Sequence, residues 1–124
     1  MPTNIRIIHA HDFIQATANG QLDLEASKKL LLELTSASAH LDDHHIILDT
    51  RLARSEMTVT DLWYLVAELG KLRSTFSPKT AVLCPLERFD HAEFFALCAG
   101  NRGFHVKAFT SYEVALEWLL AEQA

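Results

Sequence analysis

Several features are scarce in this sequence, and each absence excludes some classes of protein. No apolar run approaches the roughly 18 residues that a membrane-spanning helix needs, and the first residues lack the basic-then-apolar pattern of a signal peptide. The only two cysteines, Cys84 and Cys98, have no metal-type spacing and indicate reduced core residues. We therefore expect a cytoplasmic protein with no membrane span.

Motifs for cofactors are equally scarce. The seven histidines form no H-x-x-x-H or Cys/His cluster, and the adjacent His44 and His45 would point to opposite faces of a strand. The four glycines form no phosphate-binding loop. The sequence thus predicts neither a metal site nor a bound cofactor.

An excess of positive charge is also missing. The formal net charge is -5, which argues against a general nucleic-acid binder, because such a protein needs a basic surface to displace counterions. The chain has 124 residues, of which 49% are hydrophobic and 22% charged. This size and composition predict one soluble domain that buries a core without disulfides or metals.

Hydrophobic periodicity predicts an α/β fold. Asn19-Gly20 is a turn signal, and Asp23 can cap a helix whose apolar positions recur on one face. Asp90 can cap a later helix, and Thr110 with Glu113 forms a capping-box pattern before the last one. The expected strands are 4–9, 12–19, 45–49, 80–84 and 104–109, and the expected helices are 24–41, 58–75, 90–99 and 111–122.

The alternation of these elements predicts their topology. The first two strands could pair as a hairpin, and a helix stands between each later pair of strands. Such alternation implies right-handed crossovers. We therefore expect a mostly parallel five-stranded sheet, with the first strand antiparallel at the edge, flanked by four helices in a single domain.

The stretch 44–66 forms the predicted centre of the fold. Residues 46–48 are an unbroken apolar run, typical of a strand covered on both faces, and Asp49 follows where that strand should end. Thr58 or Thr60 can then cap the next helix. In open α/β sheets, ligands and partners bind at this carboxyl edge of the strands. The residues expected to form a partner or ligand edge are Asp49, Arg51, Arg54 and Thr60.

Each of these side chains has more than one possible role. Asp49 could ligate a cation, accept a phosphoryl group, or hold its loop through backbone N–H groups. Arg51 and Arg54 could bind a phosphate or carboxylate, or could simply be solvated loop charges. The two threonines are first of all helix caps.

Three segments resemble STAS domains, the fold of the anti-sigma-factor antagonists. Gly20-Gln21-Leu22-Asp23 is similar to the family's G-x-L-D turn, and HHIILDT resembles its central strand. The ending VKAFTSYEVALEWL resembles the bacterial SpoIIAA-like branch, often labelled STAS/SEC14-like; the matching residues are Phe109, Ala115, Trp118 and Leu119. The resemblance covers about residues 4–122.

This resemblance implies a regulatory interaction module without catalysis. In the family, a kinase phosphorylates a hydroxyl at the start of the helix after the central strand, and this controls partner binding. That position falls on Thr58 here, although Met57-Thr58-Val59-Thr60 replaces the usual Asp-Ser-x-Gly. The implied partners are a regulatory kinase or an anti-sigma-like protein.

The predicted helices carry more apolar residues than one buried face requires. This surplus could form a homodimer or partner interface, or neighbouring helices could cover it. It could also line the pocket of a small apolar-ligand or lipid carrier, which is the alternative function. An enzyme would need Asp49, Cys84 and a histidine to converge. The interface candidates are Trp63, Tyr64, Phe94, Leu97, Val114 and Trp118.

Overall fold

The computed structural model describes residues 4–10, 13–39, 45–72 and 79–121. Its five strands lie side by side in chain order. The first pair is antiparallel and the other three pairs are parallel, which confirms the predicted topology. The strands are β1 (Asn4–His9), β2 (Phe13–Gln21), β3 (His45–Arg54), β4 (Thr80–Leu83) and β5 (Val106–Phe109).

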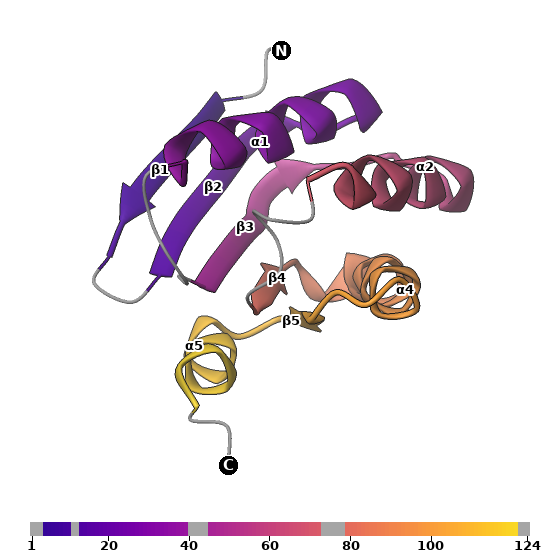
Figure 1. The fold of residues 1–124 in the computed structure, drawn as a ribbon. Helices are drawn as coiled ribbons and strands as arrows, with labels where there is room; N and C mark the ends of the chain where they lie inside the picture. Colours follow the sequence, from indigo (N-terminus) through magenta and orange to yellow (C-terminus); the bar gives the residue numbers. More distant parts are fainter. Residues whose placement is uncertain (1–3, 11–12, 40–44, 73–78, 122–124) are drawn as a thin grey trace.

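Helices cover the two faces of the sheet unequally. Three of them lie along one face, and α5 lies alone on the other (Figure 1). The face that carries α1, α2 and α4 is called the crowded face below. A short 3-10 turn, η1 (Leu86–Arg88), leads into α4, the third helix of this face. The four α-helices of the described ranges are α1 (Leu24–Ala37), α2 (Val59–Gly70), α4 (Phe89–Gly100) and α5 (Tyr112–Leu120).

The core is therefore divided between the two faces. The larger cluster lies between the sheet and α1, α2 and α4, and includes Ile14, Leu48 and Phe95. The smaller cluster lies under α5, where Leu83 and Leu119 are fully buried. Within the described ranges, no helix is both long enough and apolar enough to cross a bilayer.

Helix α1 follows the predicted periodicity. The Asp23 carboxylate accepts a hydrogen bond from the backbone N–H of Ala26 at 2.8 Å, which makes Asp23 the predicted N-cap. The predicted inner face is buried at Ser27, Leu30, Leu31 and Leu34. The helix ends at Ala37, four residues before the expected end at Leu41, which lies outside the described residues.

Helix α2 is shorter than predicted. Thr58 caps it, and the helix ends at Gly70 instead of continuing to about residue 75. Leu62, Leu65, Val66 and Leu69 form its buried stripe, as predicted. Val59 was expected in this stripe, but it is the first residue of the helix and is 51% exposed.

Two predicted caps of the C-terminal helices are wrong. Helix α4 begins at Phe89, so Asp90 lies inside its first turn, and its N-cap Arg88 makes no side-chain capping bond because η1 already supplies the preceding turn. The hydroxyl of Ser111, one residue after the predicted Thr110, caps α5 by accepting from the N–H of Val114.

The largest difference from prediction concerns β2 and β3. Asn19-Gly20 is not a turn; Gly20 takes a positive φ of 98° inside β2 and pairs with Ala53. Strand β3 consequently continues five residues past Asp49, to Arg54, through the predicted loop. Thr17 pairs with Asp49 and Asn19 with Leu52, so β3 holds one extra residue there. This β-bulge positions the side chains of the candidate site.

Candidate functional site

Asp49 holds the bulge in β3 through hydrogen bonds to Arg51. Its carboxylate accepts the backbone N–H of Arg51 at 3.1 Å and two hydrogen bonds from the Arg51 guanidinium, at 3.0 Å from Nε and 2.9 Å from Nη2. Asp49 is only 5% exposed, and a buried carboxylate needs such partners. Of the alternatives for Asp49, the structure supports the one in which the carboxylate holds the backbone.

The Arg51 side chain turns toward α5. Its guanidinium carbon lies 5.8 Å from the centre of the Tyr112 ring. The hydrogen bond to Asp49 raises the pKa of Arg51 above its ordinary value, while partial burial acts in the opposite direction. Arg51 therefore stays charged. It lies in β3 rather than in a loop, and it is paired with Asp49 while its side chain is 41% exposed.

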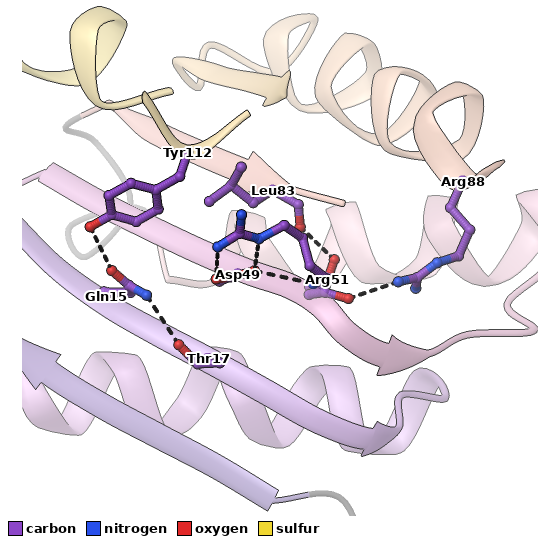
Figure 2. A network of polar contacts seen from close by, with 8 residues as sticks. Gln15, Thr17, Asp49, Arg51, Leu83, Arg88 and Tyr112 are labelled. Carbon is purple, nitrogen blue, oxygen red and sulfur yellow. Dashed lines mark hydrogen bonds and ion pairs between the residues drawn. The ribbon is translucent and has the colours of Figure 1, made fainter. Parts of the chain in front are cut away.

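A second set of contacts extends this polar network across the sheet (Figure 2). The Tyr112 hydroxyl donates to Gln15 Oε1 at 2.9 Å, and Gln15 Nε2 donates to the Thr17 hydroxyl at 3.2 Å. The network links α5 to β2 and β3. Sequence reasoning missed Gln15 and Tyr112, because their contact joins positions that are 97 residues apart.

Arg88 holds the other side of the bulge. Strand β4 ends at Leu83, so among the described strands the last part of β3 pairs with β2 and not with β4. Arg88 Nη2 donates to the carbonyl oxygen of Thr50 at 2.7 Å (Figure 2). The same nitrogen donates to the carbonyl oxygen of Ala53 at 3.0 Å. The Thr50 hydroxyl donates to the carbonyl of Leu83 at 2.6 Å. Nothing in the local sequence identifies Arg88 as this support.

Thr58 forms a reciprocal capping box with Asp61. Its hydroxyl accepts the backbone N–H of Asp61 at 3.1 Å, and the Asp61 carboxylate accepts the N–H of Thr58 at 3.1 Å. Thr58 and Thr60 are exposed, as is Arg54 at the end of β3. Thr58, rather than Thr60, is therefore the cap of α2.

The structure does not bring all predicted edge residues into one site. Asp49 and Arg51 face α5, whereas Thr58 opens a helix that packs on the opposite face of the sheet. The bulge causes this separation, since it carries β3 onward after Asp49. The candidate site on the crowded face therefore consists of the exposed Thr58 edge and the cavity beneath it.

That cavity lies between the sheet and helices α1, α2 and α4. Its volume is about 90 Å³, it is partly open to solvent, and most of its lining is apolar. Leu48, Leu65 and Phe95 form its walls, and Ser55 and Met57 of the segment before Thr58 also line it. The cavity was not predicted as such, although an apolar pocket was an expected feature of the carrier alternative.

Cys84 also lines this cavity. Burial is the main cause that raises the pKa of the Cys84 thiol above its ordinary value, and its Sγ lies 3.7 Å from the carbonyl oxygen of Phe109. His91 lines the same cavity, but Asp49 is engaged with Arg51 on the other face. The three groups of the enzyme hypothesis do not converge. In the part of the chain that the structure describes, no three His, Cys, Asp or Glu side chains group as metal ligands.

The interface candidates have different surroundings. Trp63 and Tyr64 are half exposed on α2. Their rings contact each other edge to face, with 5.6 Å between the ring centres. Leu97 and Val114 are exposed as well. Phe94 packs against the larger core cluster, and Trp118 packs against the smaller one. The rings of Trp118 and Phe109 lie 5.6 Å apart, measured between their centres.

The element order, the strand directions and the helix placement together give a SpoIIAA-like α/β fold. Several solved structures share this fold, three of them as follows. An uncharacterised DUF3478-family protein with a SpoIIAA-like fold from Shewanella loihica has a TM-score of 0.61 at 19% identity, covering 94% of this chain and 93% of that one.

The other two are anti-sigma factor antagonists. The protein from Mycobacterium paratuberculosis has a TM-score of 0.64 at 14% identity, covering 97% of this chain and 96% of that one. SpoIIAA in its unphosphorylated form has a TM-score of 0.57 at 13% identity, covering 96% of this chain and 100% of that one. No protein-family model matches the sequence, and no curated protein matches it either. At these identities the likeness shows the fold.

Proposed function

We propose that this chain is a regulatory binding module that docks a protein partner at the carboxyl edge of its parallel strands and performs no catalysis. The observation that supports this most directly is the position of Thr58. It is an exposed hydroxyl at the N-terminus of α2, in a fold shared with two anti-sigma factor antagonists.

The edge around Thr58 has the character of a docking surface. Val59 in the first turn of α2 is 51% exposed, and Leu86, after the end of the neighbouring strand β4, is 78% exposed. Charged Arg54 and Glu56 precede Thr58 and are exposed as well. Exposed apolar side chains beside charged ones are typical of protein interfaces.

Thr58 is the proposed phosphoacceptor. A phosphate there would meet the N-terminal N–H groups of α2 and the positive end of the helix dipole, which favour an anion. It would also add a charge of about -1.5 to -2 beside the Asp61 carboxylate, which now accepts the N–H of Thr58. Phosphorylation would thus open the capping box and change the surface shown to the partner.

The partner and its location can be tested by site-specific crosslinking. A photoreactive amino acid at Val59 or Leu86 would be compared with one at Ile8, which is 46% exposed on β1 at the far edge of the sheet. We expect a specific crosslinked protein from the first two positions only. Equal crosslinking from Ile8 would contradict the proposed edge.

The phosphorylation step needs a separate test with the captured partner. We expect Thr58→Glu to weaken binding about tenfold or more, while Thr58→Ser, which keeps the hydroxyl and the cap, stays within about twofold. Co-expression with a candidate kinase should yield a Thr58 phosphopeptide by mass spectrometry. An unmodified Thr58, together with unchanged binding by Thr58→Glu, would remove the switch and leave the docking proposal standing.

A further inference from the structure

The cavity beside Thr58 combines an apolar interior with basic residues among its lining. Sixteen of the described residues line it, and no Asp or Glu is among these sixteen. The basic residues among these sixteen are Arg88, which ends η1, and His91, which lies in the first turn of α4. Glu87 and Glu93 lie near enough to influence Cys84 but do not line the cavity. The charge of the lining therefore favours an anionic ligand group.

Arg88 is fixed in place before any ligand arrives. Its Nη2 already donates to the carbonyls of Thr50 and Ala53, which holds the guanidinium at the end of β3. These two bonds use one of its three nitrogens, and a guanidinium can donate five hydrogen bonds in a planar fork. A positioned guanidinium of this kind suits a carboxylate.

The volume restricts the rest of the ligand. An apolar cavity of about 150 Å³ is known to hold benzene, and this one is smaller, at about 90 Å³. A short branched alkyl group suits this space, whereas a long acyl chain does not. The hydroxyls of Thr50 and Ser55 add polar atoms to a lining that is otherwise mostly apolar.

We propose that this cavity is a binding site for a small monocarboxylic acid with a short branched aliphatic body. The body would fill the space between Leu48, Leu65 and Phe95, and the carboxylate would face Arg88 and His91. This site does not depend on Thr58 phosphorylation or on a protein partner, so either proposal can fail alone.

The test is an NMR titration of the full chain with 3-methylbutanoate. Its neutral isostere 3-methylbutanamide tests the charge, and acetate tests the aliphatic body. Ala92→Leu would fill the cavity, because Ala92 lines it. Ala96→Leu is the matched control: it makes the same change one turn further along α4, outside this cavity.

We expect saturable shifts of the backbone amides of residues 50, 55, 57, 88 and 91 with 3-methylbutanoate, and binding at least about fivefold weaker for the amide. Acetate should bind more weakly still. Ala92→Leu should abolish the shifts, and Ala96→Leu should retain them. The proposal is overturned if no saturable shift occurs, if the amide binds equally well, or if Ala92→Leu binds unchanged.

Discussion

Arg88 donates a hydrogen bond through Nη2 to the carbonyl oxygen of Thr50 at 2.7 Å, at the point where β4 stops and β3 continues with β2 as its neighbour among the described strands. The same nitrogen reaches the carbonyl of Ala53 at 3.0 Å. One side chain thus satisfies two backbone acceptors that a longer β4 would otherwise pair. We therefore expect this contact to stabilise the extended end of β3.

Replacing Arg88 with Met should therefore destabilise the fold. Hydrogen bonds from a charged donor contribute about 1.5–3 kcal/mol each, and two carbonyls would lose their partner. We expect the free energy of unfolding to fall by about 2–3 kcal/mol in urea denaturation. Arg6→Met on the exposed side of β1 is the control and should change it by less than about 0.5 kcal/mol. Equal effects of the two substitutions would show that Arg88 does not support β3.

The pair Asp49–Arg51 should be energetically coupled. The carboxylate is 7% exposed and the guanidinium 41% exposed, so solvent screens the pair only in part. A double-mutant cycle with Asp49→Asn and Arg51→Met should give a coupling of about 1 kcal/mol. The exposed pair Lys71–Glu68, at 3.2 Å, should give about 0.3–0.5 kcal/mol in the same cycle. A coupling at Asp49–Arg51 no larger than this control would mean that the bulge does not depend on the ion pair.

The sequence predicts the parallel topology because each helix and strand carries its own periodicity. Leu30 and Leu34 mark the inner face of α1 without reference to any other element. The end of β3 is different, since its pairing is specified by β2 and by Arg88, both distant in the chain. Asn19-Gly20 has the composition of a turn, and only the pairing of Gly20 with Ala53 overrides it.

The candidate site could be predicted only where it is local. Thr58 and Asp61 form a capping box three residues apart, so sequence spacing locates them. The Asp49 contact to Arg51 is also local, but the bulge that closes around it is not. The cavity is lined by residues of α1, α2, α4 and the two strands β3 and β4, so no single segment of the sequence predicts it.

The two cysteines should react at very different rates. Cys84 is buried and its thiol pKa is raised, so at a given pH a smaller fraction is thiolate, the reactive form. Cys98 is only partly buried on α4. We expect a disulfide reagent at pH 8 to modify Cys98 at least about tenfold faster, and Cys98→Ser to leave a single slow phase.

Denaturant provides the control for this comparison, because both thiols should then react at similar rates. Rapid modification of Cys84 in the folded protein would contradict its burial and would restore it as a candidate nucleophile.

The homodimer remains a prediction, and the structure indicates where to test it. Strand β5 pairs only with β4 among the described strands, and α4 and α5 flank it on the two faces of the sheet. Leu97 on α4 is 63% exposed and lies beside β5, and Val114 on α5 is 51% exposed. Phe94 and Trp118 are poor choices for substitution, because both pack against a core.

We expect light scattering to give twice the 13.9 kDa mass of the chain, and Leu97→Asp or Val114→Asp to give the single mass. An aspartate introduced into an apolar interface would be buried without a partner for its charge. The cost of removing that charge from water would weaken the dimer. Leu32→Asp, at a leucine 57% exposed on α1, is the matched control and should remain dimeric. A monomeric unmodified chain, or a dimer that survives both substitutions, would exclude this surface and leave the Thr58 edge as the place where a partner binds.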